Sequence, residues 1–90
     1  MNAVVVYNNI KDKELLDKIN LKVPFFIDYI DINTTKGKKE GWKIMSYYGT
    51  RMFPFVELEI NESNRIPFYS ERGSAIGQLI NYLNNDSNSI

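Results

Sequence analysis

The 90-residue sequence contains no cysteine and no histidine. Without cysteine the chain has no disulfides, no thiol chemistry, and no thiolate ligands for zinc or iron–sulfur clusters. Without histidine it lacks the commonest general base and a frequent metal ligand. We therefore expect no metal site and no cofactor. The sequence favours a protein that is not an enzyme, although it leaves the question open.

Neither sign of charge prevails, because eleven basic residues balance eleven acidic ones. This balance argues against nucleic acid and against an anionic membrane as partners. No apolar run approaches the ~20 residues that span a bilayer, and the N-terminal stretch lacks the features of a signal peptide. We expect a cytoplasmic protein. The abundance of Asn, Ile and Lys suggests an AT-rich genome, so a phage protein, in the host cytoplasm or the virion, is one hypothesis.

The composition is that of a small globular protein. Apolar residues make up 43 % of the chain and charged residues 24 %, which is ordinary for a folded domain. The length allows one domain and no second core. We expect a single domain over residues 1–84 and a polar, flexible tail over residues 85–90.

The first third of the chain predicts two strands joined by a helix. Residues 3–7 include three consecutive valines, which indicates a strand buried on both faces. Residues 24–32 are rich in aromatic and β-branched side chains and predict a second strand. Residues 11–19 predict a helix with Asn9 as its N-cap. Because a helix connects the strands, they should be parallel.

The remainder predicts a hairpin between two helices. Residues 33–41 suggest a solvated loop and the start of a helix, and residues 42–48 should be helical up to Gly49, which closes the helix. Residues 53–60 alternate, predicting a strand with one buried face and one wetter face that carries solvated Glu57 and Glu59. Residues 65–70 pair back as an edge strand, because Pro67 cannot donate a hydrogen bond. Ser74 or a neighbour should cap a last helix with one apolar face.

The element order β-α-β-α-β-β-α predicts an α/β fold, a four-stranded mixed sheet flanked by three helices. In the segment Tyr48–Val56 a helix ends at a glycine, a short loop follows, and a proline opens a strand. This arrangement resembles the thioredoxin-like superfamily, in its glutaredoxin-like branch. A weaker similarity, in Ser74-Ala75-Ile76 and Tyr82-Leu83, is to the N-terminal domains of glutathione transferases. The resemblance implies a thioredoxin-like fold with a cis peptide bond before Pro54.

The sequence departs from this family where redox-active relatives carry cysteine. Between the first strand and the first helix the chain has Tyr7-Asn8-Asn9. Asparagine has no titrating group, so the isolated chain cannot carry out thiol–disulfide exchange. The resemblance therefore implies a redox-inactive scaffold that acts as a protein-interaction or structural module.

Two sets of residues are candidates for binding. The resemblance implies a ligand or partner site at the proline edge and the adjoining helix starts, made of Tyr7, Asn8, Asn9, Arg51, Phe53, Pro54, Gly73 and Ser74. The aromatic second helix offers a further candidate surface for a partner, made of Trp42, Tyr47 and Tyr48. Packing or capping is the commoner role for most of these residue types.

A protein partner or self-association is the leading hypothesis. The alternative is a glutathione-binding, glutaredoxin- or transferase-like protein. In that alternative the resemblance implies that Tyr7, the Phe53–Pro54 backbone and Ser74 would hold the tripeptide.

Overall fold

The computed structural model describes residues 2–18, 25–71 and 73–88. The elements along the chain are β1 (Asn2–Tyr7), α1 (Ile10–Asp17), β2 (Phe26–Asp31), α2 (Thr35–Tyr48), β3 (Phe55–Asn61), β4 (Asn64–Phe68) and α3 (Ala75–Asn88). The strands form one mixed sheet in the order β2-β1-β3-β4. Strand β1 runs parallel to β2 and antiparallel to β3, which is antiparallel to β4. The α/β class, the element order and the edge position of Pro67 in β4 are confirmed.

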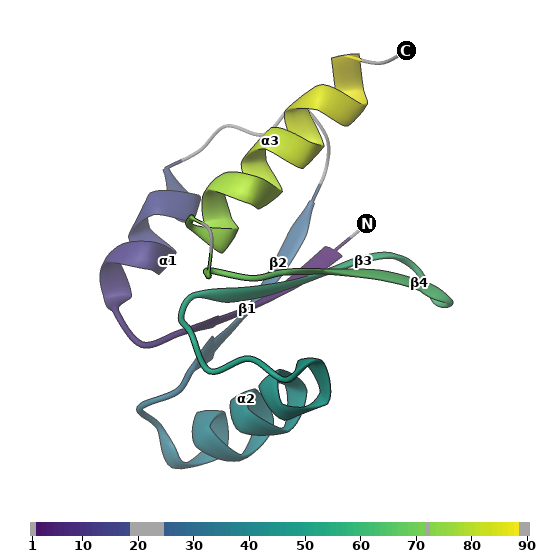
Figure 1. The fold of residues 1–90 in the computed structure, drawn as a ribbon. Helices are drawn as coiled ribbons and strands as arrows, with labels where there is room; N and C mark the ends of the chain where they lie inside the picture. The colour runs from purple at the N-terminus through teal and green to yellow at the C-terminus, as the bar shows by residue number, and fades with distance from the viewer. Residues whose placement is uncertain (1, 19–24, 72, 89–90) are drawn as a thin grey trace.

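Helices α1 and α3 cover one face of the sheet, and α2 lies on the other (Figure 1). The larger core lies on the α1 and α3 side. Alternate residues of β1 and β3 face this core, as the period of two in a strand requires. The apolar stripe of α3 packs against them, as the spacing predicts. The buried members are Ala3, Val5, Leu16, Val56, Leu58, Ala75, Ile76, Leu79 and Leu83.

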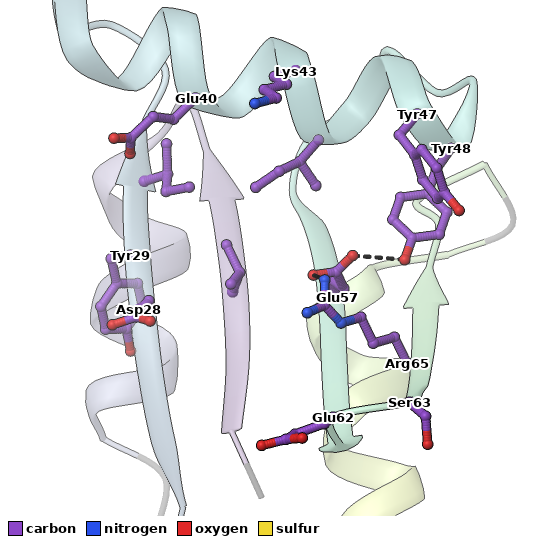
Figure 2. Close-up of a pocket in the computed structure, with 13 residues that line it drawn as sticks. Asp28, Tyr29, Glu40, Lys43, Tyr47, Tyr48, Glu57, Glu62, Ser63 and Arg65 are labelled. Carbon is purple, nitrogen blue, oxygen red and sulfur yellow. Dashed lines mark hydrogen bonds and ion pairs between the residues drawn. The ribbon is translucent and has the colours of Figure 1, made fainter.

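The smaller core lies beneath α2. It consists of Val6, Ile32, Met45 and Phe55, all of them buried. Helix α2 crosses the sheet at the end toward which β1 and β2 run, and the other half of this face has no described helix over it (Figure 2). One face of the sheet is therefore only partly covered.

Helix α2 begins at Thr35, close to the beginning of the segment 33–41 in which a loop and a helix start were predicted. Thr34 is the N-cap, and its Oγ1 accepts a hydrogen bond of 2.9 Å from the Gly37 N–H. Gly37 packs so closely on β2 that an added Cβ would lie 1.8 Å from the Asp31 carbonyl oxygen. The loop expected within residues 33–41 is therefore shorter than predicted, because the polar residues of 35–41 face solvent from a helix whose glycines let it approach the sheet. Gly49 ends the helix with φ 69°, as expected.

The other boundaries shift by smaller amounts. Helix α3 continues to Asn88, so the predicted flexible tail is helical over residues 85–88. The polar end of this helix extends beyond the sheet (Figure 1). Because no described strand lies beneath it there, the sequence needs no apolar residues to pack against the sheet. Helix α1 ends at Asp17 rather than at residue 19, which lies outside the described residues, as does Pro24 before β2. None of the helices in the described part of the chain has the length and hydropathy of a membrane span.

Candidate functional site

The predicted ligand-binding residues come together at one end of the sheet. The pairing of Val6 with Phe55 places the residues after β1 beside those before β3. The pairing of Val56 with Phe68 brings the residues after β4 to the same end. Residues 7–10, 50–54, 70–71 and 73–74 therefore meet there.

Asn8 and Asn9, before the start of α1, form hydrogen bonds with neighbouring parts of the chain. The Asn9 side chain caps the helix, because its Oδ1 accepts a 3.0 Å hydrogen bond from the Lys11 N–H. The Asn8 carbonyl accepts a 3.0 Å bond from the Asn33 side chain. A polar pocket of about 510 Å³ lies here, lined by Tyr7, Asn8, Asn9, Ile10, Asp31 and Asn33. At the start of α1 this chain therefore has a hydrogen-bonded cap.

Tyr7 is buried, and its ring lies edge-on to Tyr29 with 6.2 Å between centroids. Burial raises the pKa of the Tyr7 hydroxyl, and the carboxylates of Asp31 and Asp17 raise it further. The same carboxylates would disfavour a thiolate near this hydroxyl. Tyr7 is therefore a packed aromatic residue in surroundings unsuited to activating a bound thiol.

The Phe53–Pro54 peptide bond is cis, as the resemblance implies. Pro54 is buried, and its carbonyl oxygen accepts a hydrogen bond from the Ser70 hydroxyl. The same hydroxyl oxygen accepts a 3.2 Å bond from the Ala75 N–H, the first amide of α3. Ser70, which the sequence analysis missed, therefore ties the start of β3 to the start of α3.

Gly73 and Ser74, the exposed residues directly before α3, each bond to Gln78 of that helix. The Ser74 carbonyl accepts the first helical bond, at 3.1 Å from the Gln78 N–H. The Gly73 carbonyl accepts a 3.2 Å bond from the Gln78 side chain. No hydrogen bond from the Ser74 hydroxyl to a described residue is present, so Ser70 rather than Ser74 supplies the capping side chain.

The backbone of Phe53 is unpaired among the described residues. Neither its N–H nor its C=O bonds to any residue within the described ranges. Its ring lies 5.5 Å from that of Trp42, which is 38 % exposed. Ile10 and Met52, at the same end of the sheet, are 54 % and 47 % exposed. We call Ile10, Trp42, Met52 and the Phe53 backbone the sheet-end site; Arg51 beside it is exposed.

Trp42 therefore belongs to the sheet-end site, whereas Tyr47 and Tyr48 lie elsewhere. The Tyr48 hydroxyl donates a 2.6 Å hydrogen bond to Glu57 Oε2. Burial, followed by this bond and the negative charge of Glu57, raises the pKa of Tyr48 to about 12. Arg65 Nη1 lies 3.8 Å from the other carboxylate oxygen. Tyr47 is 83 % exposed, with its ring 4.9 Å from that of Tyr48.

The expectation that Glu57 lies on a solvated strand face is wrong. We expected it to be solvated, but only 9 % of it is exposed. Its neighbours on α2 and β4 cover it and supply the hydrogen bond and the counter-charge that a buried carboxylate needs. Alternation along β3 predicts the face on which Glu57 lies but not what packs over that face. Glu59 on the same face is half-buried.

A groove of about 960 Å³ lies on this partly covered face. We call it the sheet-face groove (Figure 2). Its walls come from α2, β2, β3 and the β3–β4 hairpin. Its lining consists of Val4, Asp28, Tyr29, Ile30, Glu40, Lys43, Ile44, Tyr47, Tyr48, Glu57, Glu62, Ser63 and Arg65.

Comparison with known protein families and with curated proteins finds no match for this sequence. Within the described residues, no three carboxylate side chains lie together in a way that could hold a metal ion. The interpretation of the site therefore rests on its geometry alone.

Proposed function

We propose that this chain is a thioredoxin-like scaffold without a reactive thiol, and that it binds an extended segment of a partner protein at the sheet-end site. The strand order and the two-sided helix arrangement support the thioredoxin-like assignment. The absence of cysteine from the whole sequence supports a role without redox chemistry.

The observation that carries the proposal is the unpaired Phe53 backbone beside exposed apolar side chains. A free N–H and C=O can pair with an extended peptide, and neighbouring apolar side chains supply contact area. Ile10 and Met52 are about half exposed, which suits contact with a partner better than packing within the chain.

The test is a selection of peptides from a random library on the immobilised full chain. We expect the selected peptides to bind at least tenfold more weakly to Ile10→Glu and Met52→Glu variants. Leu15→Glu is the matched control, because Leu15 lies on the same helix as Ile10 and is similarly exposed, at 49 %. Hydrogen exchange should show slower exchange of the Phe53 amide in the complex.

Two outcomes would count against this function. One is a selection that yields no binder, or binders that tolerate both charged variants. The other is binding of glutathione at millimolar concentration, with amide shifts confined to Tyr7, Phe53 and Ser74. That second result would support the glutathione-binding alternative instead.

A further inference from the structure

The sheet-face groove is separate from the sheet-end site, and its size suits a small ligand. Its volume of about 960 Å³ is at the upper end of the ~300–1,000 Å³ typical of small-molecule sites. Val4 and Ile30 form an apolar floor on the strands, and Ile44 faces the groove from α2. All three are only half-buried. The groove therefore offers apolar surface that the described part of the chain leaves open.

The charges around the groove favour a cationic ligand. Carboxylates line it from three elements: Asp28 on β2, Glu40 on α2 and Glu62 in the hairpin. Asp28 and Glu62 have neither an ion pair nor a side-chain hydrogen bond within residues 2–18, 25–71 and 73–88. Glu40 has only Lys36, 4.0 Å away and largely exposed. Two cationic side chains, Lys43 and Arg65, line the groove. Arg65 is paired with Glu57, so Lys43 alone of these two offsets the three carboxylates.

An aromatic wall adds a second preference for a cation. Tyr47 and Tyr48 line the groove near the end of α2, with their rings nearly perpendicular at 85°. Figure 2 shows both side chains on the same side of the groove, above Glu57. The face of a tyrosine ring attracts ammonium and guanidinium groups. The Tyr48 hydroxyl is held by Glu57 at 2.6 Å, which fixes this ring in place.

We propose that the sheet-face groove binds an organic cation, a primary amine on an apolar body. The carboxylates that Asp28, Glu40 and Glu62 place around the groove attract the amine, and the apolar body rests on Val4 and Ile30. This inference is independent of the sheet-end site.

The test uses 2-phenylethylamine as the probe, titrated into the ¹⁵N-labelled full chain. The uncharged control is 2-phenylethanol, and the charge-reversed control is 3-phenylpropionate. We expect saturable shifts in amides of β2, the second half of α2 and the hairpin. Affinity for the amine should exceed that for the alcohol at least fivefold, and the carboxylate should give no saturable shift.

Charge variants separate specific binding from general attraction to the protein. Asp28→Asn and Glu62→Gln should each weaken amine binding two- to fivefold and leave binding of the alcohol unchanged. Glu14→Gln is the matched control, because Glu14 is an exposed carboxylate on α1, across the sheet. Equal affinity for amine and alcohol would overturn the proposal, as would an equal effect of all three variants or shifts confined to the sheet-end site.

The amine could come from a free metabolite or from a lysine side chain of a protein. An acetylated Lys-Phe dipeptide amide distinguishes these sources. Tighter binding of the dipeptide at the same amides supports the proposal with a protein segment as the source. Tighter binding of 2-phenylethylamine supports it with a free amine, and failure of both probes to saturate refutes it.

Discussion

Removal of the Tyr48 hydroxyl tests whether the buried carboxylate of Glu57 depends on it. The hydroxyl donates a 2.6 Å hydrogen bond to a side chain that is only 9 % exposed. A hydrogen bond to a charged group contributes about 1.5–3 kcal/mol. We therefore expect Tyr48→Phe to lower the free energy of unfolding by about 2 kcal/mol. For a domain of this size, that loss lowers Tm by roughly 8–16 °C.

Urea denaturation followed by fluorescence measures this loss, because Trp42 is the only tryptophan and its ring contacts Phe53. Tyr47→Phe is the matched control. It removes the same atom from a neighbouring side chain that is 83 % exposed, so its effect should stay within about 0.5 kcal/mol.

A double-mutant cycle with Glu57→Gln isolates the interaction between the two side chains. The coupling energy should exceed about 1 kcal/mol, because the two groups bond directly. Changes that add within about 0.3–0.5 kcal/mol would refute the reasoning, as would equal losses for Tyr48→Phe and Tyr47→Phe.

Three further predictions concern stability. Gly37→Ala should lower the free energy of unfolding by at least about 2 kcal/mol, since its Cβ would meet the Asp31 carbonyl oxygen at 1.8 Å. Gly77→Ala, where a Cβ meets open space, should instead raise it by about 0.5–1 kcal/mol. Urea denaturation of both variants measures these changes. Ser70→Ala should lose about 1–2 kcal/mol in the same assay, because both its hydrogen bonds disappear; an unchanged midpoint would contradict the bridging role. The pKa of Tyr48 is raised to about 12 from about 10 unfolded, so its stabilisation is complete below pH ~10 and is lost as pH rises toward 12. Denaturation between pH 9 and 12 should show a smaller loss in Tyr48→Phe than in the native chain.

The sequence predicted the sheet better than the helix ends. Consecutive apolar residues in β1, alternation in β3 and Pro67 in β4 each carry a direct signal of burial or of edge position. The start of α2 gives a contrary signal, because Gly37 and Gly41 disfavour a helix. Close packing of Gly37 on the Asp31 carbonyl overrides that preference, and a tertiary contact of this kind leaves no periodic pattern in the sequence.

For the candidate sites as well, the sequence predicted which residues topology brings together but not which side chains bond to each other. The ligand-binding residues that the resemblance implied do lie at one end of the sheet, because topology brings them together. Tyr48 and Glu57 were placed on a partner surface and on a solvated strand face, yet they bond to each other. That contact depends on where α2 crosses the sheet, and the position of this crossing cannot be predicted from the two residues themselves.

The two faces of the sheet carry unequal amounts of buried apolar surface. Among the described residues, nine buried side chains lie between the strands and α1 with α3, against four beneath α2. Regions with few buried contacts open at lower free-energy cost than the rest of a domain. Helix α2 should therefore detach in partial opening events before the opposite layer loosens, and such an event would open one wall of the groove without unfolding the protein.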